Sequence, residues 1–147
     1  VADVSRDMYA RTLASIEGID DPAHRLANGV RMFIRRSHDE PHWGRFMMRF
    51  ALNDEPLRAI LTEAPALDIQ NGIEAGRYNL GSAKIESSVA LLAGTTLASM
   101  LFVIEGHQTW RQAGSDTAQL ILKALGIADT EAEEISTREL PKLASSS

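Results

Sequence analysis

The chain has 147 residues, of which 44% are hydrophobic, and a length and composition of this kind suit one folded domain and exclude wholesale disorder. Its formal net charge of −5 argues against a chain that grips nucleic acid by itself, because phosphate neutralisation needs clustered Lys and Arg. The chain has no cysteine, which excludes a disulfide framework, a thiolate zinc site and a cysteine nucleophile, and fits a cytoplasmic location.

The first half of the chain reads as a series of helices, and strand signals are nearly absent. Asp3–Glu17 has apolar residues at helical spacing and is followed by Gly18. Asp21 and Pro22 form a start signal for a second helix, which the segment Ser37–Pro41 interrupts. A short helix then carries Trp43, Phe46, Met47 and Phe50 on one face.

The second half continues the pattern. A helix after Asn53-Asp54-Glu55-Pro56 is expected to end at Pro65, and Leu67–Arg77 to form another. Ser82 is expected to cap a long helix to Glu105, Gly106–Gly114 to form a loop, and Ser115 or Asp116 to cap the next helix to Gly126. A last helix from Thr130 through Leu140 would complete the fold. The sequence therefore predicts an all-α protein of about eight helices, with a flexible tail at residues 145–147.

The stretch Ser87–Ile104 carries no charged side chain, whereas a helix of a small protein usually keeps one charged face for water. Its length approaches a membrane span, but the hydroxyl residues within it and the lack of a flanking aromatic or basic belt favour a buried helix. Large apolar residues lie on more than one face, and Ala90, Gly94 and Ala98 repeat every four residues. A second copy of the chain would cover the extra face, so the stretch predicts a two-fold homodimer.

Aromatic residues concentrate between Phe33 and Phe50, although they make up only 5% of the chain. One interpretation is an apolar pocket between helices, with methionines as adaptable walls and Arg45, Arg49, Asn28 or Tyr78 as orienting polar groups. The other interpretation is a core stripe, and for any single one of these residues the core is favoured.

Motifs for catalysis are not found. The segment from His38 to His42 has the residue types of a metal site, but a solvated turn is strongly favoured, and no metal or other cofactor is expected. No phosphate-binding glycine loop or nucleophile elbow is present, and we expect no enzyme. The helix after Ser82 offers only Lys84 near its start, which excludes a DNA-recognition helix.

Two segments carry a family resemblance: Gly72-Ile73-Glu74-Ala75-Gly76-Arg77-Tyr78, and Leu125-Gly126-Ile127 leading through Glu131-Ala132 to Leu140-Pro141-Lys142-Leu143. With the order of helices around them, they resemble the C-terminal ligand-binding and dimerisation domain of a TetR-family transcriptional regulator. Members of this family begin with a basic three-helix DNA-binding head. This chain shows none and begins with Val1, so we expect no operator binding by the chain as given.

The resemblance implies an effector-binding and dimerisation domain over residues 1–144, with residues 1–18 as the helix that connects head and body. The dimer would be a four-helix bundle of helices 82–105 and 115–126 from each copy, with interface residues Val89, Leu92, Thr96, Leu101, Ala118, Ile121, Leu122 and Leu125. A small, largely apolar effector would lie among Phe33, Trp43, Phe46, Met47, Phe50, Leu61, Ile73, Tyr78, Met100 and Phe102. Its binding would hold the heads at the wrong spacing for operator DNA, as in a repressor.

Two alternatives stay open from the sequence. The first is an all-α dimeric enzyme for an apolar substrate, for which only His38–His42 and His107 offer titratable groups. The second is a structural dimerisation module without a natural ligand, in which the aromatic stripe is simply core.

Overall fold

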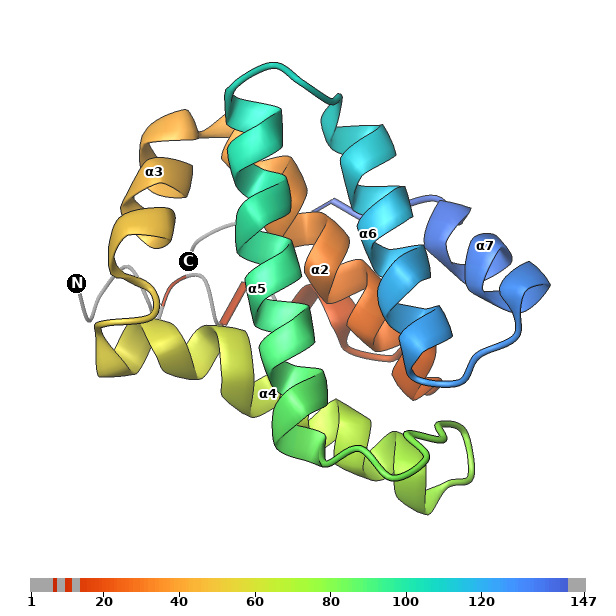
Figure 1. The fold of residues 1–147 in the computed structure, drawn as a ribbon. Helices are drawn as coiled ribbons and strands as arrows, with labels where there is room; N and C mark the ends of the chain where they lie inside the picture. Colours follow the sequence, from red (N-terminus) through yellow and green to blue (C-terminus); the bar gives the residue numbers. More distant parts are fainter. Residues whose placement is uncertain (1–6, 8–9, 12–13, 143–147) are drawn as a thin grey trace.

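A computed structural model describes residues 7, 10–11 and 14–142, and every regular element among them is helical (Figure 1). Residues 7, 10–11 and 14–16 are helical. They are followed by α2 (Pro22–Asp39), α3 (Pro41–Phe50), α4 (Glu55–Glu74), α5 (Ile85–Ile104), α6 (Trp110–Ala124) and α7 (Asp129–Thr137). The predicted all-α class is confirmed, and the number of helices is close to the eight expected.

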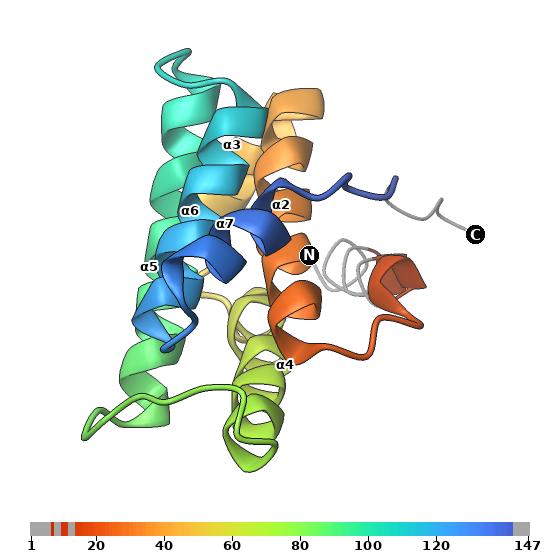
Figure 2. The same ribbon diagram turned by 90° about the vertical axis from the view of Figure 1, so that its right-hand side faces the viewer.

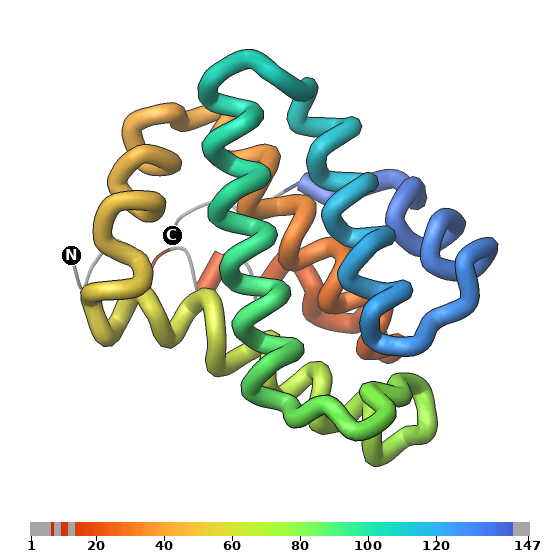
Figure 3. Tube along the Cα trace, in the orientation of Figure 1, coloured from red at the N-terminus to blue at the C-terminus, as the bar shows by residue number. Residues whose placement is uncertain are grey.

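Helix α2 lies at the centre and contacts α3, α4, α5, α6 and α7. Helices α5 and α6 run side by side along one edge of the molecule, and the described N-terminal residues lie on the opposite side of α2 (Figure 2). The trace of α4 crosses below α2 and α5 (Figure 3). Thus α2, α4 and α5 face one another over part of their length.

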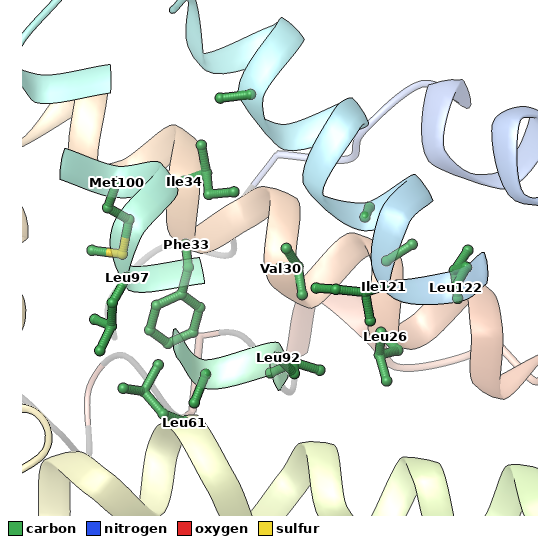
Figure 4. Close-up of a cluster of buried hydrophobic side chains, with 14 of the residues drawn as sticks. Leu26, Val30, Phe33, Ile34, Leu61, Leu92, Leu97, Met100, Ile121 and Leu122 are labelled. Atoms are coloured by element: carbon green, nitrogen blue, oxygen red, sulfur yellow. The ribbon is translucent and has the colours of Figure 1, made fainter. Parts of the chain in front are cut away.

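The core forms where apolar faces of α2, α4, α5 and α6 meet. Leu26, Val30, Phe33 and Ile34 project from α2 toward Leu92, Leu97 and Met100 of α5 and Ile121 and Leu122 of α6 (Figure 4). All these side chains are buried. Helix α5 alone among the described helices is long and apolar enough to span a membrane, but that is weak evidence, since core helices pass the same test.

Helix α2 begins as the sequence predicts and ends later. The Asp21 carboxylate accepts a hydrogen bond of 3.2 Å from the Ala23 amide, and Pro22 takes the first helical position. Of the segment Ser37–Pro41, which the sequence predicts to interrupt the helix, only Glu40 lies outside α2 and α3. Ser37 is fully buried and donates to the Ile34 carbonyl at 2.6 Å, so its hydroxyl is satisfied without leaving the helix.

Helix α4 also differs from the prediction, because it continues through Pro65 instead of ending there. Leu57 and Ile60 before the proline and Ile69 after it are all buried. Their packing compensates for the amide hydrogen bond that a proline cannot make. The expected pair of short helices is one helix of 20 residues.

The three helices of the second half, α5, α6 and α7, have ends that differ from the prediction. Helix α5 begins after Lys84, not at Ser82, and α6 begins at Trp110 because Thr109 accepts a hydrogen bond from the Gln112 amide at 3.2 Å. The loop predicted over 106–114 is correspondingly shorter. Helix α7 begins after Ala128 without a side-chain cap, and it ends at Thr137 rather than Leu140.

The Gly72–Tyr78 segment has a structural explanation. A Cβ at Gly72 would collide with the ring of Tyr78, so only glycine lets this buried tyrosine fold back onto α4. Gly76 ends the turn at a φ of +73°, which favours glycine. The Arg77 guanidinium then bridges Asp21, at 2.9 and 3.0 Å, and Glu131, at 2.9 Å for both contacts. Through Arg77, the Gly72–Tyr78 segment therefore links the start of α2 to the first turn of α7.

Candidate functional site

A cavity of about 60 Å³, counted as the volume open to the centre of a water molecule, lies between α2, α4 and α5. Helix α2 contributes five lining residues, α4 five and α5 two, and Ile16 closes the set from the N-terminal side. The lining residues are Ile16, Arg25, Leu26, Gly29, Val30, Phe33, Ile60, Leu61, Ala64, Pro65, Asp68, Leu92 and Thr96.

The walls of this cavity are mostly apolar, and small residues leave its interior open. Gly29 lies in the middle of α2, and a Cβ built there would meet nothing within 4 Å. Ala64 faces the same space from α4. The ring of Phe33 is buried in this wall, with its centroid 5.6 Å from that of Trp43 behind it. A small apolar molecule would find surfaces that water wets poorly.

A partly exposed charged pair, Arg25 and Asp68, forms part of the cavity lining. Arg25 Nε lies 3.4 Å from Asp68 Oδ1, and the side chains are 27% and 14% exposed. Burial raises the pKa of Asp68 above the ordinary carboxyl value, and Arg25 opposes this rise. Arg25 Nη1 also donates to the carbonyls of Ile16, at 3.1 Å, and Ile19, at 3.3 Å. The pair therefore ties a wall of the cavity to the segment that precedes α2.

Thr96 belongs to the lining of the cavity on the α5 side. The residue is 2% exposed, and its Oγ1 is buried and has no hydrogen-bond partner among the described residues. Pro65 lines the cavity from α4, and it has no amide hydrogen to donate to the carbonyl of Leu61. The site thus combines a mostly apolar lining with one charged pair, Arg25 and Asp68.

Of the ten predicted effector residues, the structure places two in the wall of this cavity, Phe33 and Leu61. Trp43, Met47, Tyr78 and Met100 are buried in the core outside the lining, and Phe46 and Ile73 are partly buried against it. Phe50 and Phe102 are exposed at the surface. Of the proposed orienting groups, Arg45 and Arg49 are exposed, whereas Asn28 is fully buried but not part of this wall.

The polar residues of the cavity, Arg25, Asp68 and Thr96, escaped the sequence interpretation. Arg25 and Asp68 are 43 residues apart and meet only through the packing of α2 on α4. Because the sequence predicts that a helix ends at Pro65, it places Leu61 and Asp68 in two separate helices. The one available signal was Asp68 beside the buried Ile69 in an apolar helix, a position where a carboxylate needs a partner.

The predicted dimer residues lie mostly inside the single chain. Leu92, Thr96, Ala118, Ile121, Leu122 and Leu125 are buried in it, and Val89 is partly buried, because α5 turns this face toward α2, α4 and α6. Leu101 alone of the eight is exposed. The exposed large apolar residues of these two helices are Leu91, Leu101, Phe102 and Leu120.

The histidines considered for metal or acid–base chemistry do not converge. His38 lies in the last turn of α2 and His42 in the first turn of α3, both exposed, and His107 is exposed in the loop before α6. Across the part of the chain that the structure describes, no three His, Asp or Glu side chains are placed to hold a metal ion.

Comparison with known proteins agrees with this architecture. Two solved structures of the regulator RolR, one in complex with its ligand resorcinol and one without ligand, share the fold with TM-scores of 0.82 and 0.80. Both are 22% identical to this chain and match 97% of it, and the matched region spans 70% and 72% of the RolR chains. No curated protein matches the sequence. The family model described as the tetracyclin repressor-like C-terminal domain matches residues 21–138, and the chain belongs to this family of TetR-like regulators.

Proposed function

We propose that this chain is the effector-sensing and homodimerisation domain of a transcriptional repressor, and that its effector occupies the cavity between α2, α4 and α5. The observation that carries the proposal is this apolar cavity, lined by the central helix of a TetR-like regulatory domain. RolR, which has the same fold, is known in complex with the small aromatic molecule resorcinol. A small, largely apolar molecule is the effector class that fits both facts.

Arg25 provides a route from the cavity to the N-terminal segment. It contacts Asp68 in the cavity wall and the carbonyls of Ile16 and Ile19 at the end of that segment. In our proposal residues 1–18 act as the connecting helix to a DNA-binding head. An effector that changes the Arg25 contacts then shifts the population of this helix, provided that it binds the two conformations with different affinity.

The partner in the proposed dimer is a second copy packed on the outer face of α5 and α6. Leu91, Leu101 and Phe102 are exposed on α5 together with the small residues Ala90, Gly94 and Ala98, and Leu120 is exposed on α6. No other helix in the described part of the chain covers this edge (Figure 2). In a two-fold dimer both copies contribute the same surface, so the α5–α6 pairs of two copies would form a four-helix bundle.

Filling the cavity tests the effector site directly. Resorcinol binding is measured by calorimetry for the natural chain and for Gly29→Leu, whose side chain would enter the open space. We expect heat of binding for the natural chain and loss of binding by at least about tenfold in the variant, since the leucine and the ligand compete for one volume. Gly29→Ala, which adds one methyl group, should lose less.

Gly114→Ala is the matched control, because this glycine also lies inside a helix but its added Cβ would make ordinary contact with Arg31, 3.5 Å away. It should bind resorcinol as the natural chain does. Equal binding by Gly29→Leu and Gly114→Ala would contradict the assignment of the effector to this cavity.

A further inference from the structure

We propose that the Arg25–Asp68 pair in the cavity lining binds a neutral ligand group that carries a hydrogen-bond acceptor and a donor side by side, as a carboxamide does. The acceptor takes a hydrogen bond from Arg25 Nη2, and the donor gives one to Asp68 Oδ2. The proposal rests on the proposed function, because it names the chemical class of the effector for the same cavity.

The ion pair between these two side chains is only half formed. An arginine and a carboxylate that meet edge to edge make two parallel hydrogen bonds. Here one bond joins them, from Arg25 Nε to Asp68 Oδ1, and at 3.4 Å it is long for a charged pair. Arg25 Nη1 donates instead to the carbonyls of Ile16, at 3.1 Å, and Ile19, at 3.3 Å. The second position on each partner, Nη2 of Arg25 and Oδ2 of Asp68, is therefore left over.

Both of these atoms are accessible. Neither Arg25 Nη2 nor Asp68 Oδ2 has a hydrogen-bond partner among the described residues, and neither is one of the unpaired side-chain atoms that are fully buried. They differ in this from the Thr96 hydroxyl, which is unpaired and closed off. Both residues line the cavity, and Nη2 shares one edge of the guanidinium with Nε. The unused donor and the unused acceptor thus flank the same contact.

The chemistry of the two atoms defines the group that satisfies both. A guanidinium only donates and an ionised carboxylate only accepts, so the ligand must accept at one point and donate at the next. A carboxamide does this with its carbonyl oxygen and its N–H, and it carries no charge. A carboxylate ligand has no donor and brings a negative charge to Asp68, whereas an ammonium ligand has no acceptor and brings a positive charge to Arg25. The pair therefore selects against ions of either sign.

The experiment compares benzamide, acetophenone, benzoate and benzylamine by calorimetry, since these probes share one ring and differ in the polar group. Acetophenone has a methyl group in place of the amide nitrogen and so lacks only the donor. We expect benzamide to bind at least about tenfold more tightly than acetophenone, because a site that bonds an N–H leaves its own acceptor unpaired when the ligand lacks one. Benzoate and benzylamine should bind more weakly than acetophenone.

A double variant, Arg25→Met with Asp68→Leu, tests the residues. It removes both charges together, so no single charge is left without its partner. Its affinity for acetophenone should stay within about threefold of the natural chain, and its preference for benzamide should disappear. The matched control is Arg138→Met with Glu134→Leu, which removes an exposed ion pair outside the cavity lining and should keep the preference.

Equal binding of benzamide and acetophenone by the natural chain, or a preference that survives in the double variant, would overturn the assignment to Arg25 and Asp68. Loss of acetophenone binding in the double variant would also overturn it, since the pair would then maintain the cavity and not select the ligand. In each case resorcinol binding that Gly29→Leu abolishes would leave the cavity as the effector site. If resorcinol and all the probes fail to bind to the natural chain, the proposed effector function fails as well.

Discussion

At Arg77 one guanidinium holds three parts of the chain together: the N-cap of α2, the turn after α4 and the first turn of α7. Its hydrogen bonds to Asp21 and Glu131 lower the pKa of both carboxyls and raise that of Arg77 itself. A planar guanidinium can make a two-point contact with each of two carboxylates, a geometry that an ammonium group does not match. The arginine of the Gly72–Tyr78 segment therefore stabilises the fold, and it is not one of the residues that line the cavity.

Replacing Arg77 should change how the unfolding free energy depends on pH. The unfolded carboxyls titrate near 3.8 and 4.5, and their folded pKa values are lower, so the stabilisation is present above about pH 4.5 and is lost as pH falls through the folded values. Arg77→Met should remove about 1 kcal/mol near pH 7 and flatten this acid slope. Urea unfolding at several pH values measures both.

Arg138→Met is the comparison for that series, since Arg138 makes a single exposed bridge to Glu134 at 3.0 Å. It should cost less than about 0.5 kcal/mol. A slope as steep in Arg77→Met as in the natural chain would contradict the role of the bridge.

Tyr78 and Gly72 allow a second test at the same scale. Gly72→Ala should destabilise the chain by about 1–3 kcal/mol, because the added methyl group displaces the buried Tyr78 ring. Tyr78→Phe should be neutral or slightly stabilising, because the buried Tyr78 hydroxyl has no partner among the residues that the structure describes. Denaturant unfolding checks both, and a large loss of stability in Tyr78→Phe would contradict the assignment of an unpaired hydroxyl to Tyr78.

At the scale of the element, α4 carries a proline inside its helical run. Pro65 lines the cavity and leaves the Leu61 carbonyl without its helical amide partner. Gly29, where α2 lacks a side chain, lines the same cavity. Both helices therefore depart from ideal helix chemistry at the place where they enclose the cavity.

Pro65→Ala should restore the missing hydrogen bond and raise the unfolding free energy by about 1 kcal/mol or more. Because Pro65 lines the cavity, its replacement should also change the affinity for resorcinol, which separates a role in the cavity from a role in stability alone. Thermal unfolding and calorimetry on one preparation give both values. A less stable variant would mean that the proline ring is needed for packing.

The helices themselves were largely predictable, whereas their junctions and the cavity were not. Asp21-Pro22 gives the start of α2 from local chemistry alone, since an acidic cap and a proline act within one turn. The continuity of α4 through Pro65 depends on packing before and after the proline, which no local signal records. Arg25, Asp68 and Thr96 line one cavity but come from three different helices, α2, α4 and α5. Among the predicted effector residues, only Phe33 and Leu61 belong to the cavity wall.

At the scale of the whole molecule, α5 has two apolar faces with different roles. One face, with Leu92 and Met100, packs inside the chain, and the other exposes Leu91, Leu101 and Phe102. The uncharged sequence of α5 predicted that both faces are covered, but it could not tell which face belongs to the core, since both are apolar. In the proposed dimer the exposed face meets a second copy.

A charge on that face should separate the copies. Phe102→Glu should convert a dimer into monomers, because two glutamates would be brought together in a desolvated two-fold interface. Sedimentation equilibrium measures the change. The matched control is Phe50→Glu, since Phe50 is 40% exposed against 48% for Phe102 and belongs to α3, which is not one of the two helices of the proposed interface. The dimer proposal would fail if the natural chain is a monomer or if both variants behave alike.

The open space at Gly29 also bears on how this chain responds to selection for heat resistance. A glycine in the middle of a helix costs about 1 kcal/mol relative to alanine, and here the alanine methyl would meet no neighbour within 4 Å. Substitutions that fill position 29 are thus among the easiest gains in melting temperature that the chain offers. A population screened only for thermal tolerance should accumulate them early, and the survivors should be more stable proteins that bind the effector more weakly, the more so the larger the new side chain.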